Sequence, residues 1–221
     1  MINSNIRKLT IAGWLRENDY ASYDEPMKIQ KFIFFYECAC NTRGYDYDFS
    51  SLKGYKNGPV FSPVWGDYTK ERDEFDIAAN NQYKINQEKY IIPEIIQKID
   101  FFIKTCNSIE LSNLTHTMNI WKCKKDRILA GEREVPLSSV DFNLKDKEMV
   151  DKILSAYSEE MIKDSKVIQY GNTIFVLSNN DANSLSPEQM DTLQELANLE
   201  DLENPVYISM DPEKKGRLLV D

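Results

Sequence analysis

The chain contains a single histidine, so any catalysis that needs an imidazole must use His116. A Ser-His-Asp triad would take His116 as its base, and a thiol–imidazole pair would join it to Cys106 or Cys123. The sequence has no nucleophile elbow and no second histidine to accompany these residues. We therefore favour a structural histidine whose ring hydrogen-bonds to the backbone, and we keep an enzyme that uses His116 as an alternative.

Metal and phosphate chemistry have weaker signatures in this sequence. Cys38 and Cys40 are two residues apart in an expected helix, where they point in different directions, and no CxxC pair occurs. We expect all four cysteines to be reduced thiols, as in a cytosolic protein. Gly58 is the closest approach to a phosphate loop, but no glycine-rich run or P-loop lysine follows it. The sequence therefore implies no metal and no cofactor.

A basic cluster lies in the helix expected at 119–130, and it could grip a few phosphates. The net charge of the whole chain is −9, however, and nucleic-acid binding needs a positive surface. We interpret the cluster as a solvated helix face and expect no nucleic-acid partner. A protein partner would instead carry a basic face. The cluster consists of Lys122, Lys124, Lys125 and Arg127.

The elements that would position these residues are organised around a helix predicted at residues 27–40. Asp24 can cap it, and Pro26 fits its first turn. Its apolar residues extend almost all round the helix, which is typical of a core helix and predicts the most buried helix of the chain. Only four side chains on it need a polar environment: Lys28, Gln30, Lys31 and Glu37.

A tight turn follows about 25 residues after the start of this helix. There Gly58 can take a positive φ, and Pro59 fixes the direction in which the chain leaves the turn. The order of this helix, this turn and a later Leu-Thr-His box before a tryptophan resembles the SocA-like antitoxin family, also called the Panacea domain. The family pattern is "LQKLLYF", then "KYGPV", then "LTH…W". The resemblance covers roughly residues 5–130, with Ile29, Phe32 and Ile33 in place of the usual leucines. The matching residues are Lys28, Gln30, Lys31, Tyr55, Asn57, Gly58, Pro59, Thr115, His116 and Trp121.

The resemblance implies an antitoxin of a toxin–antitoxin system, not an enzyme. Such a protein binds a cognate toxin, often one that stops translation, and inhibits it by direct contact. The family also allows an adaptor that delivers a partner to a protease. We expect the contacts on the turn and on the acidic C-terminal segment, where residues 179–221 hold ten acidic and three basic residues. The predicted toxin-binding residues are Lys56, Asn57, Glu200, Asp201 and Glu203.

The remaining pattern predicts a mainly α fold with a short irregular β segment near the turn and a small C-terminal α+β unit. We expect a helical domain at 1–165 and a ββαββ extension at 166–221, whose first hairpin turns at Gly171-Asn172. Residues 1–7 lack the apolar run of a signal peptide, so we expect a cytoplasmic protein with no membrane partner. Within the first domain we expect helices at 4–18, 63–75, 93–106, 108–118, 119–130 and 143–163, with a polar link at 18–24 and a loop at 76–90. In the extension we expect a loop at 179–184.

Overall fold

The computed structural model describes residues 1–199, 202–214 and 216–220. These residues form mainly helices with two small sheets, so the predicted mainly α fold class is confirmed. The chain divides into two compact units. Unit 1 comprises Met1–Ile103 and Ser108–Ala156, and unit 2 comprises Lys104–Asn107 and Tyr157–Asp221. None of the described helices is both long enough and apolar enough to cross a membrane.

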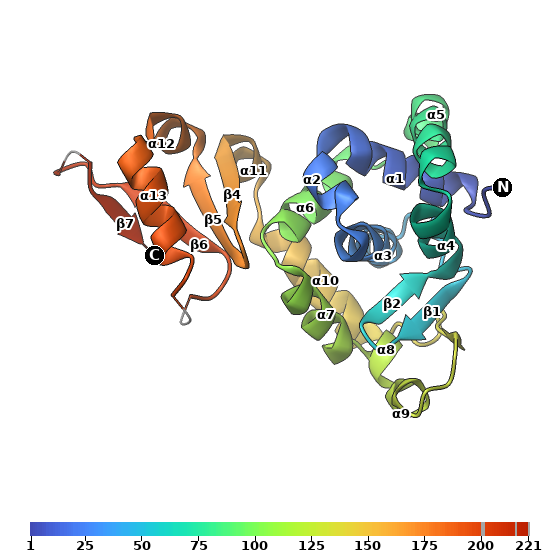
Figure 1. The fold of residues 1–221 in the computed structure, drawn as a ribbon. Coiled ribbons are helices and arrows are strands. Elements are labelled where there is room, and N and C mark those ends of the chain that lie inside the picture. Colours follow the sequence, from blue (N-terminus) through green and yellow to red (C-terminus); the bar gives the residue numbers. More distant parts are fainter. Residues whose placement is uncertain (200–201, 215, 221) are drawn as a thin grey trace. The chain divides into compact units, whose positions relative to one another are not determined.

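Unit 1 is built around helix α3 (Pro26–Thr42), which Figure 1 shows at its centre. Every residue from Lys28 to Cys40 is buried, as the all-round apolar pattern predicts. Phe32, Ile33 and Tyr36 are completely buried, so this prediction is confirmed. The cap differs from expectation, because Glu25 occupies the N-cap position without a side-chain hydrogen bond and Asp24 ends a short preceding helix, α2 (Tyr20–Asp24).

Helix α1 (Ile6–Asn18) touches α3 through Trp14, which stacks on Phe32 with ring centroids 5.7 Å apart. Its closest neighbour is α5 (Arg72–Tyr90), however. A Cβ atom at Gly13 would lie 2.2 Å from the Ala79 carbonyl oxygen, so the two backbones approach more closely than any other residue would allow. Helix α1 therefore packs mainly against α5.

The predicted loop at 76–90 is wrong, because α5 runs through all of it. Most of its residues are polar, but it has a narrow apolar stripe in which Phe75 and Ala79 are buried. The single helix expected at 63–75 is also wrong. Helix α4 (Ser62–Lys70) ends within this range, and α5 begins at Arg72. A surface helix needs only a stripe of apolar contacts, and the rest of its surface can be fully polar.

The other helices of unit 1 follow the predicted order with shorter lengths. The expected helix at 119–130 is divided into two, and Gly131 follows them with a positive φ of 84°. Asn143 caps the next helix through the Asp146 N–H, but that helix stops at Ala156. These elements are α6 (Pro93–Lys104), α7 (Ser108–Thr117), α8 (Asn119–Lys122), α9 (Lys125–Leu129) and α10 (Leu144–Ala156).

The predicted β segment is a three-stranded antiparallel sheet in the order β2-β1-β3. Strands β1 (Leu52–Tyr55) and β2 (Gly58–Phe61) form a hairpin in which Leu52 pairs with Phe61 and Tyr55 with Gly58. The turn between them is Lys56-Asn57. The short strand β3 (Val135–Pro136) pairs with β1, and sequence analysis did not predict it.

Unit 2 contains a four-stranded sheet in the order β4-β5-β6-β7. The hairpin that turns at Gly171-Asn172 is present, and the Ser186 capping box opens a helix. Asn179–Ser184 forms a helix capped by Ser178, so the loop predicted there is wrong. The described elements are α11 (Glu159–Asp164), β4 (Ser165–Tyr170), β5 (Thr173–Ser178), α12 (Asn179–Ser184), α13 (Pro187–Leu196), β6 (Val206–Met210) and β7 (Leu218–Val220).

Candidate functional site

Two polar side chains of α3 hold the outer edge of the β1–β2 hairpin. Strand β2 is an edge strand, and such strands leave backbone N–H and C=O groups without a neighbouring strand. Gln30 Oε1 accepts the Phe61 N–H at 3.0 Å. Lys31 Nζ donates to the Asn57 carbonyl at 2.8 Å and lies 3.4 Å from the Pro59 carbonyl. These two side chains therefore substitute for the missing strand and fix the turn on the core helix.

Gly58 is required at the centre of this arrangement. Its φ of +104° is unfavourable for residues with a side chain. A Cβ atom there would also lie 2.3 Å from Lys31 Nζ and 2.4 Å from Thr115 Oγ1. Thr115 itself donates to the Ser112 carbonyl at 2.8 Å. The glycine thus lets α3 and α7 approach the turn from two sides.

His116 and Trp121 hold the other end of the turn. Trp121 Nε1 donates to the Tyr55 carbonyl at 2.9 Å, and the His116 ring hydrogen-bonds to the Lys56 backbone. The two rings are in contact, with centroids 4.1 Å apart and ring planes tilted by 31°. His116 Nε2 is buried and has no hydrogen-bond partner among the described residues. The Leu-Thr-His box and the tryptophan therefore meet at the turn.

The carboxylate of Asp146 positions the helix that carries Trp121. Its two oxygens accept the N–H groups of Asn119 at 2.6 Å and Ile120 at 2.9 Å, at the N-terminus of α8. Backbone N–H groups at a helix start lack partners within the helix, and a buried acceptor satisfies them. Burial raises the pKa of Asp146. Helix α10 thereby fixes α8, and α8 fixes the tryptophan against the turn.

Lys31 is unusual because it is completely buried and forms no ion pair with a described residue. Burial lowers the pKa of Lys31 to about 7, because the charged amine is removed from water without a carboxylate to compensate. A neutral amine has two N–H groups, which match the two carbonyl acceptors of the turn. Burial lowers the pKa of His116, and the nearby Lys31 and Lys125 lower it further.

An apolar pocket with a volume of about 290 Å³ opens beside the turn. Trp65 is 43% exposed at its wall, whereas Lys56 and Asn57 are exposed at the hairpin. The two predicted toxin-binding residues of the turn therefore lie together on one surface. The pocket is lined by Pro26, Met27, Gln30, Tyr55, Lys56, Asn57, Val60 and Trp65.

The other predicted site residues lie apart from this turn or outside the described residues. Lys28 is buried and pairs with Glu25 at 3.5 Å. Glu203 is exposed in unit 2. Glu200 and Asp201 lie outside the described residues. Of the three acidic residues predicted to contact the toxin, the structure therefore describes only Glu203.

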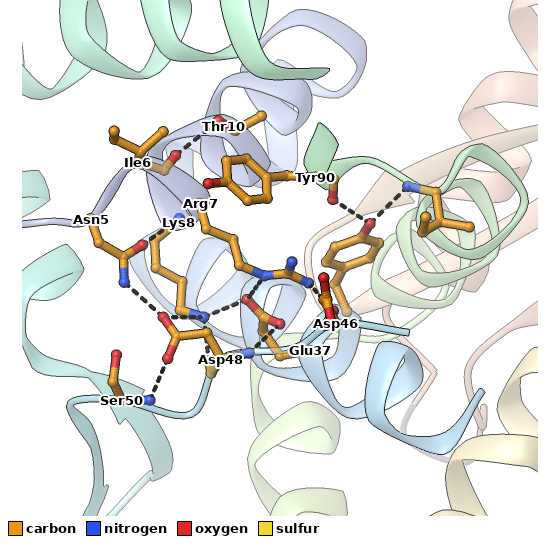
Figure 2. A network of polar contacts seen from close by, with 12 residues as sticks. Asn5, Ile6, Arg7, Lys8, Thr10, Glu37, Asp46, Asp48, Ser50 and Tyr90 are labelled. Carbon is orange, nitrogen blue, oxygen red and sulfur yellow. Dashed lines mark hydrogen bonds and ion pairs between the residues drawn. The ribbon is translucent and has the colours of Figure 1, made fainter. Parts of the chain in front are cut away.

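A second polar centre, shown in Figure 2, was missed by sequence analysis. Glu37 is completely buried on α3, where it pairs with Lys8 and, at 2.8 Å, with Arg7 Nε. Its other oxygen accepts the Asp48 N–H at 2.9 Å. Lys8 also donates to the Asp48 carbonyl, and burial lowers the pKa of Lys8 against the opposing effect of Glu37. The cluster attaches the segment before β1 to α1 and α3.

The described residues assemble no group of three or more histidine, cysteine or acidic side chains suited to a metal ion. All four cysteines are free thiols. Cys123 lies 3.5 Å from Asp141 Oδ1, and burial raises the pKa of its thiol. A raised pKa disfavours the thiolate that a cysteine–histidine pair would use as its nucleophile.

Comparisons with protein-family models, with curated proteins and with solved structures found no match for this chain.

Proposed function

We propose that this chain is an antitoxin that neutralises a protein toxin by direct binding, and that the Lys56-Asn57 turn with the adjacent pocket is its contact surface. The observation that carries the proposal is the convergence of the family-like residues on this turn. Residues from three helices, α3, α7 and α8, bind successive backbone groups between Tyr55 and Phe61.

This convergence supports binding because it fixes a surface before a partner arrives. A preorganised contact surface loses little conformational entropy on association. The side chains that do the fixing are mostly buried, while the residues they present, Lys56 and Asn57, are exposed. Buried side chains thus hold an exposed turn in a fixed conformation beside an apolar pocket.

The proposed function is tested by titrating a toxin with this protein at known molar ratios. The candidate toxin is the product of the reading frame adjacent to the gene for this chain. Toxin activity should fall linearly to zero at a fixed ratio and return when the two proteins are separated. A trace of this protein that silences an excess of toxin, or a toxin recovered in covalently altered form, would contradict binding.

A second candidate is an enzyme that uses His116, and one observation favours it. His116 Nε2 is buried with no hydrogen-bond partner among the residues that the structure describes, near the amine of Lys31, whose pKa is about 7. Perturbed titratable groups of this kind occur often at catalytic sites. The two candidates differ in turnover, so the titration described above separates them.

A further inference from the structure

The pocket beside the turn has the size of a site for one side chain. Its volume of about 290 Å³ lies at the lower limit of small-molecule sites, which span roughly 300–1,000 Å³. Its walls are largely apolar, with Met27 from α3, Val60 from β2 and Trp65 from α4. A large aliphatic or aromatic side chain of a partner would fill it and cover the exposed face of Trp65.

Gln30 gives this pocket a hydrogen-bond donor that has no acceptor among the described residues. Its Oε1 accepts the Phe61 N–H, so its Nε2 must be the donor end of the amide. That nitrogen is buried and has no hydrogen-bond partner among the described residues. A buried donor without a partner costs free energy, which an acceptor on a ligand would recover. An oxygen acceptor next to the apolar group therefore fits this site.

The charge beside the pocket points to the same chemistry. Lys56 lines the pocket, and Lys125 lies near enough to lower the pKa of His116, whose ring binds the Lys56 backbone. Both lysines are exposed, and neither forms an ion pair with a described residue. Lys56 is thus a positive charge at the pocket with no ion pair among the described residues, and it favours a carboxylate on the partner.

We propose that this pocket receives one large apolar side chain from an acidic peptide segment, whose backbone or carboxylate oxygens meet Gln30 Nε2 and Lys56. This inference rests on the proposed function, because it specifies which part of the toxin contacts the turn. The partner segment is thus a short sequence with leucine, phenylalanine or a similar residue, and aspartate or glutamate within two positions of it.

The proposal is tested with a phage-displayed library of random peptides selected on the full chain. The selected peptides should contain a large apolar residue flanked by acidic residues. Their binding can be followed by tryptophan fluorescence, because Trp65 is 43% exposed whereas Trp14 and Trp121 are 8% and 2% exposed. Selection of basic peptides, or no enrichment over peptides selected on a pocket-filled variant, would overturn the proposal.

Variants then locate the binding site of a selected peptide. Val60→Phe should fill the pocket, and Lys56→Glu should repel the acidic residues, each weakening binding roughly tenfold or more. Val140→Phe and Lys84→Glu make the same chemical changes at exposed positions and should leave the affinity unchanged. Trp65→Ala serves as a second pocket variant that removes an exposed wall rather than adding volume. Because it lacks the fluorescent reporter, the affinities of all variants are compared by titration calorimetry. Equal affinity in all five variants would place the peptide elsewhere and refute the site.

Toxin titration with the same variants separates this inference from the proposed function. If Val60→Phe and Trp65→Ala no longer neutralise toxin but wild type selects no acidic peptide, the antitoxin proposal stands and the partner chemistry is wrong. If the peptides bind as expected and no toxin is neutralised by wild type, the pocket chemistry stands and the antitoxin proposal is wrong.

Discussion

Lys31 shows how one residue can connect a core helix to an exposed turn. The amine is buried, pairs with no carboxylate in the described part of the chain, and donates to carbonyls of the turn. The sequence indicated that Lys28, Gln30, Lys31 and Glu37 need polar surroundings. It did not indicate that these surroundings are inside the protein, because the partners of Gln30, Lys31 and Glu37 come from segments distant in sequence.

The stability of this protein should depend on Lys31 in a defined pH range. The folded pKa of Lys31 is about 7, against 10.5 in the unfolded chain, so the unfolded state binds more protons between these values. Stability therefore rises with pH in this range, by at most about 1.4 kcal/mol per pH unit from this group. The full penalty applies below pH 7, where Lys31 must be protonated in the folded state.

Chemical denaturation of wild type and Lys31→Met between pH 6 and 10 measures this effect. The difference in unfolding free energy should change in favour of wild type as the pH rises from about 7, because the variant lacks the titrating amine. Subtracting the two curves removes the contribution of the other titrating groups. A difference that is independent of pH would show that Lys31 keeps an ordinary pKa.

Among the carboxylates of unit 1, Glu37 should contribute most to the free energy of unfolding. Glu37→Gln preserves the shape of the side chain but removes the carboxylate that pairs with Arg7, and it leaves the buried Lys8 with the more distant Asp48, 3.7 Å away. Breaking a buried ion pair in this way costs about 3–5 kcal/mol. Thermal unfolding measures the loss. The matched control is Glu132→Gln, which breaks the fully exposed pair with Arg127 and should leave the melting temperature unchanged.

At the scale of elements, prediction succeeded where local chemistry decides the structure. The apolar pattern of α3 and the Gly171-Asn172 hairpin are local signals, and both are present. Helix α5 failed the prediction because its stability comes from close packing on α1, at Gly13, which no local pattern in residues 76–90 reveals. Strand β3 failed for a similar reason, since its pairing with β1 is long-range.

The candidate site was predicted only in part, because its hydrogen bonds join segments that are distant in sequence. The family-like pattern identified most of the side chains that reach the turn, but not which backbone groups they bind. Gln30, Lys31 and Trp121 all contact the segment Tyr55–Phe61. The pocket wall contributed by Trp65 was missed, because a single exposed tryptophan on a short helix has no distinctive sequence signal.

The hairpin turn should tolerate no side chain at its glycine. Gly58→Ala forces alanine into a positive φ and pushes its Cβ against Lys31 and Thr115. We expect a loss of roughly 1–3 kcal/mol and a weaker complex with the partner. Gly66→Ala is the matched control, because it lies within α4 and its Cβ meets no atom within 4 Å. That substitution should raise the melting temperature slightly, since alanine favours helix. A Gly58→Ala variant as stable as wild type would contradict the arrangement of the turn.

At the scale of the whole molecule, the charge is distributed unevenly. The exposed Lys56 lines the pocket of unit 1, whereas residues 179–221 hold ten acidic and three basic residues. Short-range contacts and long-range attraction can therefore use different parts of the chain. A partner that is acidic at its pocket-binding segment and basic over the rest of its surface would satisfy both.

The acidic segment should affect how fast the complex forms more than how long it lasts. Charges at the edge of an interface change the association rate, whereas buried contacts change the dissociation rate. Reversing Glu200, Asp201 and Glu203 to lysine should slow association and reduce its dependence on salt, with little change in dissociation. Val60→Phe should do the opposite, by speeding dissociation from the pocket. Stopped-flow measurements between about 50 and 500 mM salt separate the two effects, because exposed charges are screened over this range. If the triple reversal alters dissociation alone, the acidic segment is a direct contact rather than a steering surface.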